Sequence, residues 1–164
     1  MAEHARMLVR RALVALLKQE NADVGDNVFT GRAHPLTKDE LPAIDVDFGR
    51  VGSRPDGGPI ATSSRSGPTR ILRRTALLTL GVTVRHADDY LDVVDAVWAD
   101  IEPALAENNR LIDDDHPNGL VVHITPVGEP RVAITAEGDV PVAASEMLFE
   151  VEYVTAFNAP ESIA

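Results

Sequence analysis

The feature that most constrains the fold is an alternation of hydrophobic and polar residues over residues 75–86. The hydrophobic positions are Ala76, Leu78, Leu80, Val82 and Val84. Threonines and an arginine fill most positions between them, with Leu77 as the exception. A period of two places alternate side chains on opposite faces of a strand, so the pattern predicts a β-strand with one buried face. Residues 70–74 would extend this strand beyond the core, where its edge could pair with another chain.

Two segments have the hydrophobic spacing of amphipathic helices. The first spans residues 3–20, with the stripe Ala5, Leu8, Val9, Ala12, Leu13, Leu16 and Leu17. The second spans residues 88–107, with the stripe Leu91, Val94, Val97, Trp98, Ile101 and Leu105. Hydrophobic residues three and four positions apart share one face of a helix. We therefore expect each helix to bury one face, with Trp98 in the core.

The second predicted helix also has an acidic face, weighted to its N-terminal half. Its members are Asp88, Asp89, Asp92, Asp95, Asp100 and Glu102. Carboxylates are favoured there because the N-terminus of a helix has a partial positive charge. Pro103 would kink or finish the helix near its end.

Further strands are predicted on both sides of this helix. Two short ones lie at 27–30 and 43–50, and three lie at 120–126, 131–136 and 143–155, the first two of these joined by a turn at 127–130. Residues 158–164 are predicted to be a C-terminal tail. The order of elements predicts a single α+β domain over residues 1–164. Its sheet would be mostly antiparallel or mixed, with five to six strands and both helices packed on one face.

Residues 51–69 differ from the rest in composition. The stretch VGSRPDGGPIATSSRSGPT is rich in Gly, Ser and Pro, which predicts a flexible arm or long loop. From residue 50 to residue 74 there are six arginines and one acid, Asp56, within a chain of 15 basic and 26 acidic residues. Two interpretations stay open: an ordinary solvated loop, or a basic arm that docks on an acidic surface of a neighbour.

The overall composition excludes several classes of function. The 164 residues include no cysteine, which excludes disulfides, thiolate catalysis and zinc–thiolate sites. The net charge of −11 disfavours binding to nucleic-acid phosphates. No apolar run approaches the roughly 20 residues that span a bilayer. The N-terminal residues lack the ordered blocks of a signal peptide, so we expect synthesis in the cytoplasm.

No known catalytic motif is present among the five histidines. Asp113, Asp114, Asp115 and His116 could ligate a hard cation, but EF-hand spacing is absent and we expect a solvated turn ahead of Pro117-Asn118-Gly119. His86 with Asp88 and Asp89 would form an acid–base group only if they faced a pocket. We expect no catalytic, metal or cofactor site.

The order of segments resembles a known family. The segments are Arg10-Arg11-Ala12-Leu13-Val14, Val28-Phe29-Thr30-Gly31-Arg32, Leu41-Pro42-Ala43-Ile44-Asp45-Val46, the strand at 74–84, the helix at 90–97, and Ala144-Ser145-Glu146-Met147-Leu148-Phe149-Glu150-Val151-Glu152-Tyr153. Over residues 5–155 they resemble the tail terminator proteins of long-tailed phages, of the lambda minor tail protein U type.

The resemblance implies a structural role in the virion, at the head-proximal end of the tail. Such proteins form a ring, usually of six subunits, that ends polymerisation of the tail tube protein and receives the head–tail connector. DNA passes through the channel without being read, and no membrane is involved. A ring needs a contact between two different surfaces of neighbouring copies. The candidate residues for this contact are Arg65, Arg70, Arg73 and Arg74 on one side and Asp92, Asp95 and Asp100 on the other.

Two other functions are compatible with the sequence. The first is another phage neck, tail-completion or tail tube protein, which would have a similar sequence pattern. The second is a small α+β enzyme or ligand-binding module, which would need a deep pocket lined by His86, Asp88, Asp89 and His123.

Overall fold

Two helices and six strands make up the part of the chain that the computed structural model describes, which is residues 4–32, 35–55, 71–85, 88–112, 116–135, 142–156 and 159–163. The elements are α1 Ala5–Glu20, β1 Val28–Phe29, a 3-10 turn at Lys38–Glu40, β2 Ala43–Pro55, β3 Ile71–Arg85, α2 Tyr90–Glu107, β4 His123–Thr135, β5 Val142–Ala156 and β6 Ala159–Ile163. Their strands form one sheet in the order β1-β2-β3-β5-β4, with β6 paired to β5. The predicted α+β fold is confirmed.

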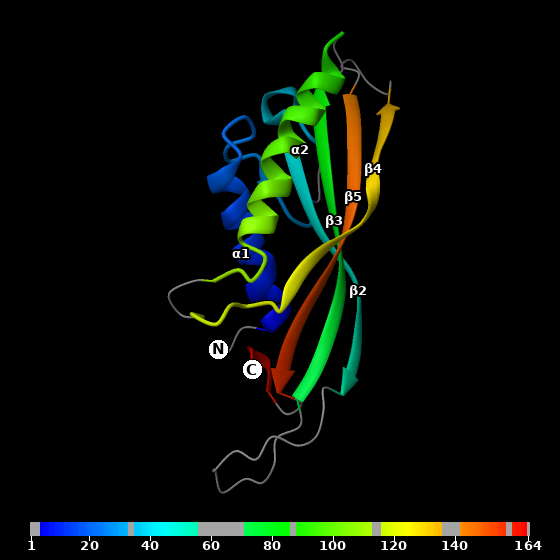
Figure 1. Ribbon diagram of the computed structural model, residues 1–164. Helices are drawn as coiled ribbons and strands as arrows, with labels where there is room; N and C mark the ends of the chain where they lie inside the picture. The colour runs from blue at the N-terminus through cyan, green and yellow to red at the C-terminus, as the bar shows by residue number, and fades with distance from the viewer. Residues whose placement is uncertain are drawn as a thin grey trace, which may run out of the picture.

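The sheet is mixed, because β1 runs parallel to β2 while every other pairing in the described sheet is antiparallel. Its centre is the pair β3 and β5, which stay in register from Ile71 opposite Ala156 to Arg85 opposite Val142. These long strands twist along the length of the molecule (Figure 1).

Both helices lie on one face of this sheet, as predicted (Figure 1). The alternating residues of β3 that face them, such as Leu78, Leu80 and Val82, are fully buried. They pack in one core with Leu13 of α1 and Ile101 of α2. Within the described residues the opposite face of the sheet has no helix over it, and its side chains are largely exposed. Neither described helix is long and apolar enough to cross a lipid bilayer.

The strand β2 is longer than predicted. It continues through a register shift after Phe48 as far as Pro55, where Val51 lies opposite Ala76. The first five residues of the predicted arm, 51–55, therefore belong to a strand, because backbone pairing with β3 does not depend on hydrophobic alternation. Residues 56–69 of the arm lie outside the described part. The predicted extension of β3 towards residue 70 is present, since β3 begins at Ile71.

The C-terminal third also differs from the prediction. Residues 123–135 form one strand, β4, rather than two strands joined by a turn. The Gly-Glu-Pro segment produces a register shift between Val127 and Arg131 instead of a reversal of direction. Pro126 and Pro130 are tolerated because β4 is an edge strand, where a missing backbone N–H costs no ladder bond. The predicted tail contains a short strand, β6, which pairs with the end of β5.

Candidate interaction surfaces

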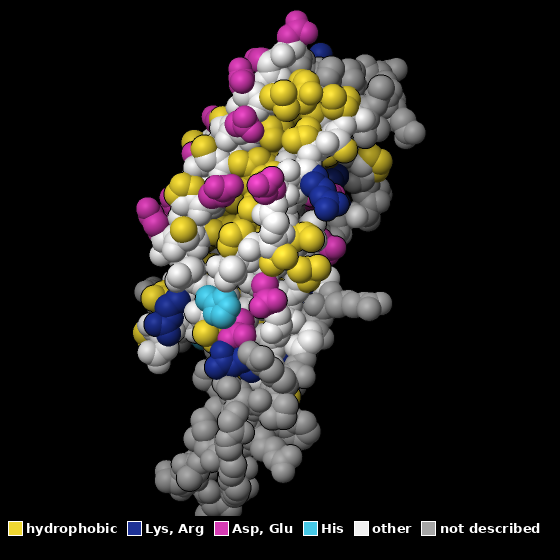
Figure 2. All heavy atoms as spheres, turned by 45° about the vertical axis from the view of Figure 1, so that its right-hand side comes forward, with side chains coloured by type: hydrophobic (Ala, Val, Ile, Leu, Met, Phe, Trp, Pro, Cys, Tyr) yellow, Lys and Arg dark blue, Asp and Glu magenta, His cyan; other side chains and the backbone are white. Residues whose placement is uncertain are grey.

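The predicted acidic residues lie along α2. Asp92 and Asp95 are exposed and three positions apart, so they are neighbours on the helix surface. Asp100 is half-buried further along the same helix. Figure 2 shows acidic side chains gathered along this helix, next to a band of hydrophobic side chains. The structure therefore brings Asp92 and Asp95 together on an exposed surface.

The hydrophobic band marks a groove between α2 and the edge strand β4. One hollow of about 500 Å³ is lined by Val94, Asp95, Trp98, Ala99, Glu102, Glu129, Pro130, Val132 and Ser145. A second hollow of about 290 Å³ is lined by Glu102, Leu105, Ala106, Ile124, Pro126, Met147 and Phe149. The two hollows share Glu102, so they adjoin. The floor is apolar and the carboxylates of Asp95, Glu102 and Glu129 contribute to its walls. We call this surface the α2–β4 groove.

The strand that borders the groove has an unpaired edge. Among the described strands β4 pairs only with β5, so its other side presents free backbone N–H and C=O groups. Val132 and Ile134 face the helix side of the sheet, opposite Ser145 and Ala143, yet they are 46% and 52% exposed. Exposed hydrophobic residues that cluster beside a free strand edge are typical of protein–protein contacts.

The two described arginines predicted to make the subunit contact, Arg73 and Arg74, do not line the α2–β4 groove. Arg65 and Arg70 lie outside the described residues. Arg73 forms an ion pair with Glu152, a side chain that is only 6% exposed. Arg74 donates a hydrogen bond from Nε to the hydroxyl of Thr155, at 2.8 Å. Both arginines thus contact strand β5 of their own chain.

Another basic group lies at the start of α1. His4, Arg6, Met7 and Arg10 line an open hollow of about 390 Å³, which we call the basic pocket. Arg6 donates to the backbone carbonyls of Phe48 and Gly49, the latter at 3.4 Å. This anchors the start of α1 to the irregular part of β2. The four-residue spacing of Arg6 and Arg10, which places them on one side of a helix, was the available sequence signal for this group.

A buried tyrosine lies close to these arginines. Tyr153 of β5 is fully buried, and its hydroxyl has no hydrogen-bond partner among the described residues. Burial raises the pKa of Tyr153, and the positive charges of Arg74 and Arg6 act in the opposite direction. The Nε of Arg10 is also buried without a hydrogen-bond partner. This end of the molecule therefore combines positive charge with unused hydrogen-bond donors.

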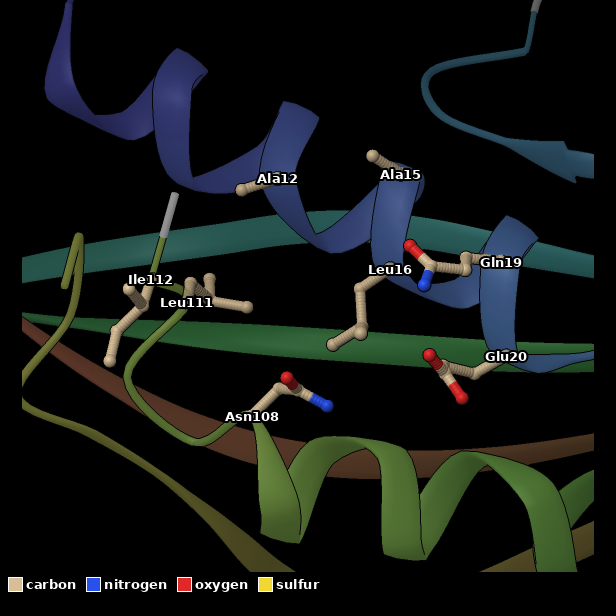
Figure 3. A pocket seen from close by; sticks show the side chains of 8 residues that line it. All are labelled: Ala12, Ala15, Leu16, Gln19, Glu20, Asn108, Leu111 and Ile112. Atoms are coloured by element: carbon tan, nitrogen blue, oxygen red, sulfur yellow. The ribbon is translucent and has the colours of Figure 1, made fainter. Parts of the chain in front are cut away.

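A fourth hollow, of about 330 Å³, lies between α1 and the end of α2 (Figure 3). Its walls are Ala12, Ala15, Leu16, Gln19, Glu20, Asn108, Leu111 and Ile112. In Figure 3 the polar side chains of Gln19 and Glu20 come from α1 and that of Asn108 from the C-terminal end of α2. These groups can accept and donate hydrogen bonds, but the lining offers no nucleophile with an adjacent base.

The residues considered for chemistry do not meet in the described part of the chain. Asp88 and Asp89 are exposed at the start of α2, and His123 lies on β4 with Nδ1 4.0 Å from the carboxylate of Glu152. His86 and residues 113–115 lie outside the described ranges, and His116 is half-buried. Within those ranges no group of three or more His, Asp or Glu side chains is placed to hold a metal ion.

Comparisons with known proteins find similarity among solved structures. No protein-family model and no curated protein matches the chain. Among solved structures, a similar chain comes from the virion of a native gene transfer agent (GTA) particle. The two chains are 15% identical and align with a TM-score of 0.43 over 91% of this chain and 90% of the other.

Proposed function

We propose that this chain is a structural virion protein that acts as a tail terminator. Six copies would form a ring on the head-proximal end of a phage tail tube. The ring would end polymerisation of the tube protein, provide the docking surface for the head–tail connector, and let DNA pass without specific binding. The chain would act by contact with other subunits rather than by catalysis.

One observation carries the proposal: the α2–β4 groove and the acidic start of α2 form one continuous exposed surface. The groove supplies an apolar centre, in which Val132 and Met147 take part, and Asp95 and Glu102 supply its charged border. An apolar centre with a polar rim is the usual anatomy of a protein–protein interface. The order of segments in the sequence, which resembles that of tail terminators, points to the same kind of role.

A ring also requires that the surface on one copy meets a different surface on the next. The described part of the chain supplies a second surface of opposite charge, the basic pocket of Arg6 and Arg10. An overall charge of −11 makes copies repel one another, so the attraction has to come from local complementarity. The pair of surfaces supports a head-to-tail contact that can close into a ring.

Light scattering after size-exclusion chromatography, with negative-stain microscopy of the same fractions, tests the proposal. We expect closed rings, and we expect shorter tubes when the chain is added to polymerising tail tube protein. A strict monomer at every concentration, with and without tube protein, would contradict the proposal. Long tubes formed by this chain alone would contradict it as well and would identify a tube subunit.

A further inference from the structure

We infer that the basic pocket receives the acidic start of α2 from the next copy in the ring. The inference rests on the proposed function, since it names the two surfaces that meet between neighbouring subunits. The ligand of the pocket is therefore a carboxylate of an aspartate side chain. The residues that carry the contact are Arg10 on one copy and Asp92 and Asp95 on the other.

The basic pocket has donors that its own chain does not use. Arg10 lines the hollow and is half-buried: its Nε–H has no acceptor among the described residues but is itself buried, so a carboxylate of a neighbour would meet the outer end of the guanidinium. A guanidinium has five donors in a planar fork that matches a carboxylate, and hydrogen bonds between charged groups are about twice as strong as neutral ones. Two other basic residues of the described part are already paired, Lys18 with Asp26 and Arg32 with Asp45.

The start of α2 carries exposed negative charge, which is complementary to the basic pocket. Four aspartates, Asp88, Asp89, Asp92 and Asp95, are exposed within eight residues. None of their carboxylates has an ion-pair or hydrogen-bond partner among the residues that the structure describes. A helix holds the last two at a fixed spacing, so little side-chain ordering is needed when they meet a cation.

The two surfaces lie at opposite ends of one molecule and cannot meet within it. α2 begins just after Arg85, which is opposite Val142 at the start of β5, whereas the tyrosine close to the pocket, Tyr153, is near the other end of β5. Eleven strand residues separate those positions, which corresponds to roughly 35 Å at about 3.3 Å per residue. In Figure 1 the start of α1 lies near the chain termini and the start of α2 at the far end. A contact between them therefore joins two copies head to tail.

Nucleic-acid phosphate is the competing ligand for a basic pocket, but the charge of the whole chain disfavours it. A duplex presents a long row of phosphates to a molecule of net charge −11. A second copy is repelled overall as well, but it brings only the few aspartates of one helix end close to the arginines, at short range where screening by salt is least. The partner of the basic pocket is thus a second copy of this chain.

Charge reversal in the full-length protein tests the contact. We expect Arg10→Glu to raise the protein concentration at which half the chains are in rings by about tenfold or more. We expect the double variant Asp92→Lys, Asp95→Lys to raise it by a similar factor. The combined variant, which carries Arg10→Glu, Asp92→Lys and Asp95→Lys in one chain, reverses both surfaces and should recover much of the loss. Arg131→Glu is the matched control, because Arg131 is exposed on β4, opposite Glu146 on the face of the sheet away from the helices, and the change in charge is the same.

The outcomes separate the inference from the proposed function. If the wild-type chain forms no rings, the proposed function fails. If the wild type forms rings and Arg10→Glu forms them as readily as Arg131→Glu does, only the inference fails. Arg10→Gln, which removes the charge and keeps a polar side chain, replaces Arg10→Glu if circular dichroism shows that the latter does not fold. Loss of rings in Arg10→Glu without recovery in the combined variant, or binding of a DNA duplex that Arg10→Glu abolishes, would overturn the aspartate partner.

Discussion

Trp98 of α2 donates a hydrogen bond from Nε1 to the hydroxyl of Ser145 on β5, across 3.0 Å in the interior. Ser145 is fully buried and Trp98 is 5% exposed, so water does not compete for either group. The bond joins the helix to the sheet at the base of the α2–β4 groove, which both residues line. This polar link within an apolar floor therefore helps to hold α2 on the sheet where the groove lies.

Replacement of Ser145 by Ala should destabilise the fold, because the indole N–H of Trp98 would stay buried without an acceptor. A buried donor left unpaired costs about 1–3 kcal/mol. Urea unfolding followed by tryptophan fluorescence measures this, since Trp98 is the only tryptophan of the chain. Thr125→Ala, at an exposed position on the neighbouring strand β4, is the control and should cost less than about 0.5 kcal/mol. Equal losses for the two variants would show that the hydrogen bond contributes nothing.

Gly119 should not tolerate a side chain, for two separate reasons. Its φ of +91° is a conformation that residues other than glycine rarely adopt, and a Cβ there would lie 2.5 Å from the carbonyl oxygen of Arg110. We expect Gly119→Ala to lower the free energy of unfolding by roughly 3 kcal/mol. Gly25→Ala is the matched control, because Gly25 also has a positive φ, +56°, but nothing lies within 4 Å of a Cβ at that position.

Gly25→Ala should lower the free energy of unfolding only by the cost of holding a residue with a Cβ at positive φ, about 1–2 kcal/mol. The difference between the two variants in chemical unfolding then measures the steric clash with Arg110 alone. If Gly119→Ala lowers the stability no more than Gly25→Ala does, the loop that contains Arg110 moves away and the clash with its carbonyl oxygen does not contribute to the loss.

The elements with regular hydrophobic patterns could be predicted from the sequence. The alternation in β3 and the stripes of α1 and α2 are local, because each is set by which side chains face one core. The same locality explains the errors in β4, where Gly-Glu-Pro between two hydrophobic runs fits a turn and a register shift equally well. The direction of the chain after Gly128 is decided by pairing with β5, and turn residues alone do not contain that information.

The candidate site was only partly predictable for a related reason. The acidic face of α2 follows from helical spacing, and Asp92 and Asp95 are exposed as expected. The partner of Arg73 is Glu152, 79 positions later in the chain, and the two meet only because β3 lies next to β5 in the sheet. The α2–β4 groove likewise depends on strand order, which no local pattern specifies. Sequence reasoning therefore found the charged helix and missed the surface beside it.

Removal of the hydroxyl of Tyr153 should leave the isolated chain as stable or make it more stable. The hydroxyl is buried without a partner among the described residues, so Tyr153→Phe removes a desolvated polar group and leaves no new gap in hydrogen bonding. We expect a gain of about 0–2 kcal/mol in the free energy of unfolding at pH 7. A loss of more than about 1 kcal/mol would indicate that the hydroxyl has a partner in the folded chain.

The same variant should change the behaviour at alkaline pH. Burial raises the pKa of Tyr153 above its unfolded value near 10, so the folded state favours the neutral hydroxyl. The stability linked to this group is fully present below pH 10 and is lost as the pH rises towards the folded pKa, because the unfolded chain ionises first. Tyr153→Phe should therefore lose less stability than the wild type between about pH 10 and 11, as followed by urea unfolding at each pH. Parallel curves for the two proteins would contradict a raised pKa.

A charge placed on the exposed edge of the α2–β4 groove should weaken assembly and spare the fold. Val132 is 46% exposed on the helix side of β4, opposite Ser145, so Val132→Lys should change the free energy of unfolding by less than about 0.5 kcal/mol. In the proposed ring this position meets a neighbouring copy, and we expect the concentration for half-assembly to rise about tenfold, which corresponds to roughly 1.4 kcal/mol. Val127→Lys is the matched control: Val127 is 45% exposed on the same strand but is paired with Leu148 on the opposite face of the sheet. Light scattering of both variants then identifies the face that makes the contact. An equal effect of the two lysines would contradict the prediction, because it would mean that added charge on β4 opposes assembly on either face.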